Sequence, residues 1–164
     1  MWYFILTAPG IIVHELAHLF FCLLSGVKVY KVNLFRFDRV AGYVVHAEPQ
    51  GFISSFLISF GPLLINSYLA MFLFTKVLAP YNLWDLLFVW LGLAIGLQAI
   101  PSTGDAQSLL QNANRNFFRH PLKIVFYPLV LILYLLNLLK RLYIDIIFVV
   151  ALFYIAHKYF INYL

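Results

Sequence analysis

The sequence carries very little charge. Only 10% of its 164 residues are Asp, Glu, Lys or Arg, whereas an ordinary soluble domain has about 25%. By contrast, 64% of the residues are hydrophobic, which is more apolar surface than a soluble chain of this length can bury. This balance argues against an ordinary soluble domain and predicts a protein whose solvent is lipid.

Cysteine and clustered positive charge are also scarce. The single cysteine, Cys22, excludes an internal disulfide. The net charge is +5, but the basic residues lie near the ends of apolar segments and form no continuous stripe. We therefore expect no nucleic-acid partner. No linker, repeat or low-complexity tract interrupts the chain, so we expect one compact membrane domain.

Several apolar stretches approach the length of about 20 residues that a helix needs to cross a bilayer. They are residues 2–25, 52–75, 83–101, 122–139 and 143–162. The fold predicted from them is an all-α polytopic membrane protein with about five transmembrane helices. The first stretch has no basic region before it and carries a His-Glu motif, so we interpret it as a retained helix rather than a signal peptide.

The basic residues orient these helices through the positive-inside rule. Most of them lie in the loops after the first and third stretches, and we place both loops in the cytoplasm. The N-terminus of this multi-pass protein of the cell membrane then lies outside. Lys76, Lys140 and Arg141 fall on the outer side, where Lys140 and Arg141 conflict mildly with the rule.

Residues 27–48 differ from the apolar stretches around them. They are rich in β-branched and aromatic residues with partial alternation, and Asp38 to Gly42 offer a turn. Alternation of this kind is typical of strands. We predict a small β-hairpin at the cytoplasmic membrane surface.

The first apolar stretch contains the motif His14-Glu15-Leu16-Ala17-His18. Residues four apart on a helix lie one turn above each other, so both imidazoles can bind one metal ion. Zinc suits them because it accepts imidazole nitrogen and lowers the pKa of bound water to about 7. Glu15 projects to the side, where its carboxylate can take the proton of that water. We predict that the two histidines bind zinc and that Glu15 is the general base.

Three other interpretations of the motif stay open. The polar groups can simply join helices by hydrogen bonds, although each ionisable group near the bilayer centre costs about 2.5–3.5 kcal/mol and usually marks function. In a different functional class, a membrane transporter would use such groups as an ion or proton relay. A catalytically inactive zinc-binding adaptor is the third possibility.

A catalytic zinc ion normally takes a third protein ligand. The candidates are His46, Glu48, Asp85, Asp105, His120, Asp145 and His157. Asp105 is favoured because it follows the third stretch on the predicted side of the histidines, where Pro101 and Gly104 allow a non-helical backbone in a protein-lined cavity. His46 and Glu48 come next, since a hairpin can fold back over the site.

Two of the candidate residues also have structural interpretations. Asp105 can lie in the first turn of a helix that begins near Gly104 and is capped by Ser102 or Thr103. Cys22 shares a helix face with His18, so it can supply a thiolate ligand. A small apolar filler is the other interpretation of this cysteine.

Further motifs accompany the His-Glu motif: Gly61-Pro62 with Asn66 in the second stretch, and the distal Pro101 followed by Asp105. Together they resemble the site-2 protease group of intramembrane metalloproteases, over about residues 5–110. The resemblance implies that His14, His18 and Asp105 bind one zinc ion per chain and that Glu15 activates water. It also implies that Asn66 holds substrate backbone or stabilises the oxyanion. The alternative role of Asn66 is a hydrogen bond between helices.

The resemblance further implies a domain organisation and a substrate class. Residues 1–115 would form the metalloprotease core and residues 116–164 would add accessory helices. The substrate would be a membrane-spanning protein, cut near the cytoplasmic side of the bilayer. We expect a minimal form without PDZ-like or nucleotide-sensing modules. An unwound substrate segment would pair with the hairpin of residues 27–48 by strand addition.

Overall fold

A computed structural model describes residues 2–36, 42–77, 82–115, 117 and 121–160. It is mostly helical with one small antiparallel sheet, as the sequence predicts. In chain order the elements are α1 (Trp2–Leu6), α2 (Ala8–Leu24), β1 (Val29–Asn33), β2 (Tyr43–His46), α3 (Phe52–Phe74), α4 (Leu83–Leu97), α5 (Thr103–Asn114), α6 (Pro121–Leu139), η2 (Lys140–Leu142) and α7 (Ile144–Phe160).

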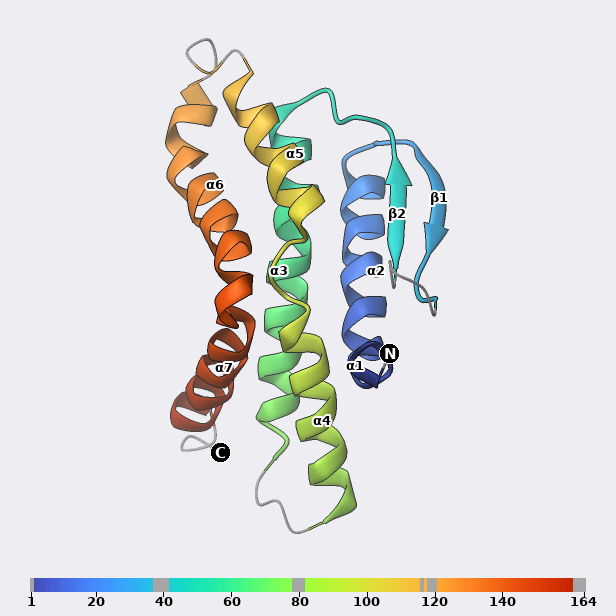
Figure 1. Cartoon of the computed structure of the whole chain (residues 1–164), viewed down its shortest axis with the longest axis vertical. Coiled ribbons are helices and arrows are strands. Elements are labelled where there is room, and N and C mark those ends of the chain that lie inside the picture. Colours follow the sequence, from blue (N-terminus) through green and yellow to red (C-terminus); the bar gives the residue numbers. More distant parts are fainter. Residues whose placement is uncertain (1, 37–41, 78–81, 116, 118–120, 161–164) are drawn as a thin grey trace.

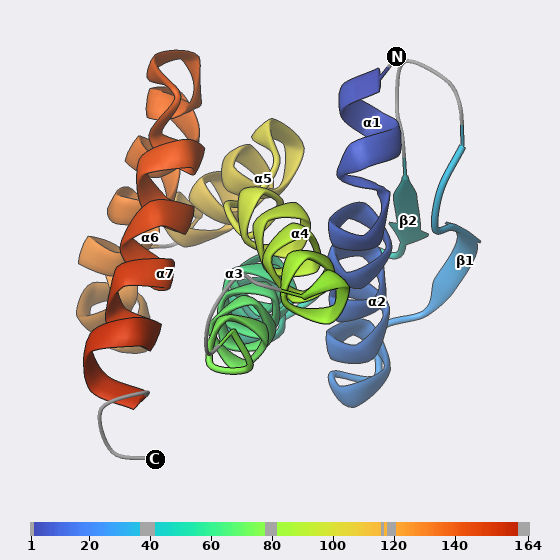
Figure 2. The same cartoon turned by 90° about the horizontal axis from the view of Figure 1, so that it is seen from below.

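The helix α3 occupies the centre of the molecule, with α2 on one side and α6 and α7 on the other (Figures 1 and 2). The sheet lies on the outer side of α2. β1 and β2 pair antiparallel, with Val29 opposite His46 and Asn33 opposite Tyr43. The predicted hairpin is therefore confirmed, although most of its predicted turn lies outside the described residues.

The helix predicted over residues 83–101 ends earlier than the sequence indicates. α4 ends at Leu97, and α5 continues in the same general direction after a break at residues 98–102 (Figure 1). Pro101 disfavours helical backbone at the residue before it, and Ser102 then begins α5 as its N-cap. The predicted helix over residues 83–101 is therefore too long, and its end is the break that leads to Asp105.

Small residues let the helices approach closely. A Cβ atom added at Gly10 of α2 would lie 1.9 Å from the carbonyl oxygen of Ala94 in α4. A Cβ atom at Gly61 of α3 would lie 2.1 Å from the Phe21 ring of α2. Crossings at small residues are typical of helices that pack in membranes. These two contacts hold α2, which carries the histidines, firmly against α3 and α4.

The C-terminal helices α6 and α7 pack against different parts of α3. α6 contributes Val130 and Leu133 to an apolar cluster with α3 and α5, and α7 contributes Val149 to a second cluster with α3 and α4. Within the part of the chain that the structure describes, two helices, α3 and the continuous α6–η2 segment, are long enough and apolar enough to cross a membrane, so the predicted set of about five spans is not confirmed. α2 and α4 are apolar but shorter.

The end of α6 differs from the sequence expectation. The positive-inside rule predicts Lys140 on the opposite side of the molecule from Asp105. Instead its Nζ atom donates a hydrogen bond of 2.8 Å to the carbonyl oxygen of Ile100, in the break before α5. The reason is that α6 ends about halfway along the long axis of the molecule, beside that break. The helix α7 continues from there to the lower end of the molecule in Figure 1.

Candidate metal centre

His14 and His18 point the same way from successive turns of α2. Their Nε2 atoms lie 3.2 Å apart, and both side chains are buried. Two imidazole nitrogens at this separation are close enough to bind one metal ion. The sequence spacing of four residues therefore gives the geometry that it predicts.

Asp105 completes the group from the first turn of α5. Its Oδ2 atom lies 3.2 Å from Nε2 of His18 and 3.8 Å from Nε2 of His14. The three predicted ligands thus converge, and they form a group that could hold a metal ion. Helix α2 supplies two ligands and the broken α4–α5 segment supplies the third.

The dimensions of the group fit a tetrahedral zinc ion. Two ligand atoms that each lie about 2.0–2.1 Å from zinc, at a tetrahedral angle, are roughly 3.3–3.4 Å apart. The three separations between Nε2 of His14, Nε2 of His18 and Oδ2 of Asp105 lie between 3.2 and 3.8 Å. Two imidazoles and one carboxylate are also a ligand set of the catalytic zinc type, which keeps a fourth position open.

A backbone carbonyl fixes the tautomer of His14. The Nδ1 atom of His14 lies 2.6 Å from the carbonyl oxygen of Gln98, the residue that follows α4. A carbonyl oxygen can only accept, so Nδ1 carries the hydrogen and Nε2 keeps its lone pair for a metal. Such outer contacts orient metal-binding histidines in most metalloproteins. Sequence reasoning missed this contact because a backbone oxygen leaves no trace in the residue pattern.

Asp105 also caps the helix that carries it. Ser102 and Asp105 form a capping box, in which the Ser102 N–H and hydroxyl donate to Asp105 Oδ2 at 3.0 and 2.6 Å. From α3, the hydroxyl of Ser59 donates to the Asp105 carbonyl oxygen at 3.4 Å. The capping role and the place beside the histidines, set out as alternatives from sequence, therefore coexist in one residue.

Glu15 lies beside this group and is buried. Its carboxylate is within electrostatic range of His18 and Asp105. The hairpin covers it: a Cβ atom added at Gly42 would lie 2.8 Å from Cγ of Glu15. Gly42 thus leaves the space that the Glu15 side chain occupies, a contact that the sequence pattern did not reveal.

Asn66 is fully buried and joins three helices. From α3, its Nδ2 atom donates to the carbonyl oxygens of Gly10 in α2 and Ile95 in α4, at 3.2 and 3.1 Å. This is the hydrogen bond between helices that the sequence left open for this residue. Both amide hydrogens are used in it, so the oxyanion role stays a prediction that these contacts do not support.

Among the described residues, none of the other candidate ligands belongs to the group. His46 contacts the carbonyl oxygen of Ala47 through its Nδ1 atom, and Glu48 pairs with Arg115 at 3.9 Å. The remaining acidic and histidine candidates are Asp85 in the first turn of α4, Asp145 and His157 in α7, and His120, which lies outside the described residues. Cys22 packs in an apolar cluster with Phe21 and Ile58, which fits its interpretation as a filler.

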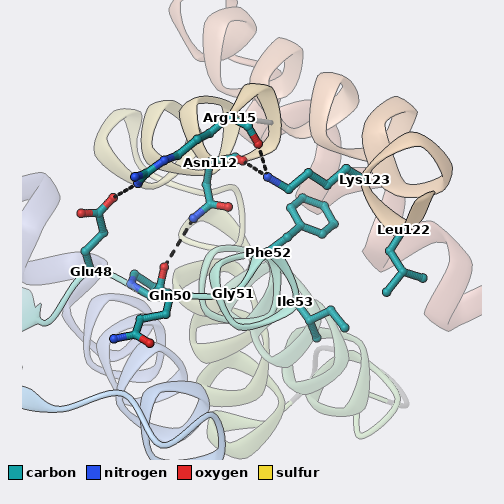
Figure 3. Close-up of a pocket in the computed structure, with 10 residues that line it drawn as sticks. Glu48, Gln50, Gly51, Phe52, Ile53, Asn112, Arg115, Leu122 and Lys123 are labelled. Carbon is teal, nitrogen blue, oxygen red and sulfur yellow. Dashed lines mark hydrogen bonds and ion pairs between the residues drawn. The ribbon is translucent and has the colours of Figure 1, made fainter. Parts of the chain in front are cut away.

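A separate pocket of about 620 Å³ lies where the linker after β2, the start of α3, the end of α5 and the start of α6 meet (Figure 3). Lys123 reaches across it and donates to the carbonyl oxygens of Asn112 and Arg115 at the end of α5. Its ammonium group also faces the Phe52 ring. These contacts make Lys123 a cap for α5, since a cation at a helix C-terminus is favourable.

Comparison with protein families, with curated proteins and with solved structures gives no match for this chain. The resemblance to the site-2 protease group therefore stays a prediction from the sequence.

Proposed function

We propose that this protein is an integral-membrane zinc metalloprotease that hydrolyses peptide bonds of membrane-spanning substrates near the cytoplasmic side of the bilayer. The observation that carries the proposal is the convergence of His14 Nε2, His18 Nε2 and Asp105 Oδ2 beside the buried Glu15. An ion relay needs ionisable groups spaced along a path. Three potential ligands at one point suit a hydrolase better.

The apolar surface supports the membrane location. α6 exposes Val125, Leu131, Ile132, Leu135 and Leu138 to between 44% and 72% of their full area. Large apolar side chains in such numbers are unfavourable in water and suit lipid. Together with the shorter apolar helices α2 and α4, this surface supports a polytopic arrangement in which α3 spans the bilayer and α6, η2 and α7 run one after the other beside it (Figure 1). The basic residues then set the end of α2 and the start of α3 towards the cytoplasm.

Zinc would be held by His14, His18 and Asp105, and when bound it supplies a Lewis acid that polarises water and the substrate carbonyl. The His14 ring is pre-oriented by the Gln98 carbonyl, and both rings are pre-oriented by their place on α2. The carboxylate is pre-oriented by the Ser102 cap. The chain therefore presents a rigid ligand set that does not need to reorganise before it binds the ion.

Glu15 carries the proton in the proposed reaction. Its carboxylate takes a proton from the attacking water and delivers it to the leaving amine. A carboxylate is suited to both steps because the same oxygen can accept and then release the proton. Burial beside the ligand group keeps Glu15 close to the reacting atoms and away from bulk water.

The hairpin is the proposed receiver of the substrate. A substrate helix must unwind first, because its peptide bonds are hydrogen-bonded and shielded by side chains. The two-stranded sheet formed by β1 and β2 leaves an unpaired edge on each strand. An unwound segment can add to one of these edges, and the Gly42 contact with Glu15 brings the hairpin directly to the proposed base.

Substitution of Glu15 by Gln tests the proposal on all proteins of a membrane at once, so no single substrate has to be chosen. Membranes that contain the wild type or Glu15→Gln, matched for amount and zinc content, are compared by mass spectrometry of protein N-termini. We expect new termini within or beside membrane spans in the wild type alone. Equal termini in both samples would show that Glu15 is not the base. Zinc-dependent ion flux without new termini would favour the transporter alternative.

A further inference from the structure

The break between α4 and α5 leaves backbone carbonyl groups without hydrogen-bond partners inside either helix. α4 ends at Leu97 and α5 begins at Thr103, so the carbonyl groups of Ile100 and Pro101 fall outside both helices. Both residues are buried. Unpaired carbonyl groups in such surroundings are costly, and irregular backbone at membrane depth occurs only where protein or water satisfies it.

The end of α6 supplies the missing partners. Asn137 donates from Nδ2 to the Pro101 carbonyl oxygen at 3.0 Å, and Lys140 donates from Nζ to the Ile100 carbonyl oxygen at 2.8 Å. Asn137 and Lys140 are three residues apart, so they lie on one face of the α6–η2 segment. Two adjacent carbonyl groups of the break are thus held by two side chains from the same face.

We propose that Asn137 and Lys140 are positioning residues that hold Asp105 in place as a metal ligand. The inference rests on the proposed metal site. Pro101 directly precedes Ser102, which caps α5 and binds Asp105 Oδ2. A shift of the break would therefore move the cap, and the cap would carry the carboxylate away from the histidines.

The charge of Lys140 strengthens this arrangement. Its ammonium group lies within electrostatic range of Asp105 and Asp145, and it is only partly exposed. A lysine inside an apolar segment is unfavourable, and such residues usually mark function. A charge-assisted hydrogen bond is stronger than a neutral one, so Lys140 is suited to fix a carbonyl group. The α6–η2 segment thereby helps to position a ligand of the proposed metal site.

The test compares Lys140→Met with Lys140→Arg in the purified full chain. Methionine keeps the length and loses the donor, whereas arginine keeps a cationic donor. Arg141→Met is the matched control, because Arg141 is the exposed basic neighbour. Zinc affinity is measured by competition with a chelator, and the ligand geometry by the visible absorption of bound Co²⁺. Helix content is measured by circular dichroism.

We expect Lys140→Met to bind zinc more weakly, by up to the roughly 10–100-fold that loss of a direct contact of a metal ligand costs. Its Co²⁺ absorption should change, while Lys140→Arg and Arg141→Met resemble the wild type. Should Lys140→Met lose helix content, Asn137→Leu gives the same comparison with the cation retained. Unchanged affinity and Co²⁺ absorption in Lys140→Met or Asn137→Leu, with a wild type that binds metal, would overturn this inference alone. A wild type that binds no metal would overturn the proposed function as well.

Discussion

The Nε2 atom of His18 lies 3.2 Å from the Oδ2 atom of Asp105, although the hairpin, α3 and α4 separate the two residues in the chain. Both residues are held in place by the structure around them. His18 is fixed by α2, and Asp105 by the Ser102 cap and by Ser59. A site that the folded chain preorganises and the unfolded chain lacks links metal binding to stability.

Removal of zinc should therefore destabilise the protein. Zinc at a thousand times its dissociation constant adds about 4 kcal/mol to the folded state by mass action. We expect the melting temperature in detergent to fall after treatment with a chelator and to recover when zinc is returned. Asp105→Ala is the control, and its melting temperature should respond weakly to zinc. A wild-type melting temperature that is the same with and without zinc would contradict this linkage.

Ser102→Ala should loosen the third ligand. Loss of an N-cap hydroxyl costs about 0.5–2 kcal/mol, and here the same hydroxyl also donates to Asp105 Oδ2. We expect both a lower free energy of unfolding and a weaker zinc affinity. Ser102→Thr keeps the hydroxyl and should restore both quantities. If Ser102→Ala binds zinc as tightly as the wild type, the cap does not position the carboxylate.

Asn66→Ala should lower stability more than it lowers the rate of the chemical step. It removes two buried hydrogen bonds, to Gly10 and Ile95, at a cost of about 1–3 kcal/mol. The measurement is unfolding in a denaturing detergent, with Ser67→Ala as the control, because the Ser67 hydroxyl has no hydrogen-bond partner among the described residues. A loss of about 10²–10³ in kcat with unchanged stability would instead support the oxyanion role.

Gly42→Ala should impair cleavage and spare zinc. The added Cβ atom would lie 2.8 Å from Cγ of Glu15 and 3.0 Å from the carbonyl oxygen of Leu34. Overpacking of this kind costs about 1–3 kcal/mol. Because the clash displaces Glu15, the proposed base, we expect a cleavage rate that is lower by about 5–150-fold. Gly51→Ala is the matched control, since its nearest atom is Ser54 Oγ at 3.8 Å. Equal cleavage rates for the two variants would show that the hairpin does not position Glu15.

Much of this arrangement could be predicted from the sequence because local periodicity encodes it. The spacing of His14 and His18 on a helix sets their common direction. Pro101 and Gly104 mark a break in an apolar stretch, and that break is where Asp105 meets the histidines. The long apolar runs likewise indicated the helices, although the predicted helix over residues 2–25 divides at Thr7 into α1 and α2.

Other features could not be predicted because they depend on contacts between distant backbone atoms. The carbonyl groups of Gln98, Ile100 and Pro101 bind His14, Lys140 and Asn137, respectively. No residue pattern identifies which carbonyl groups a fold leaves unpaired. The orientation rule placed Lys140 away from Asp105 for the same reason, since it counts charges and does not register that α6 ends at mid-height.

Metal content tests the central claim most directly. Detergent-purified wild type, His14→Ala and Asp105→Ala are supplied with zinc, freed of excess metal and analysed by inductively coupled plasma mass spectrometry. We predict one zinc ion per chain in the wild type and much less in both variants, since each removes one of the three converging ligands. A wild type that holds no zinc, or variants that hold as much as the wild type, would contradict the account.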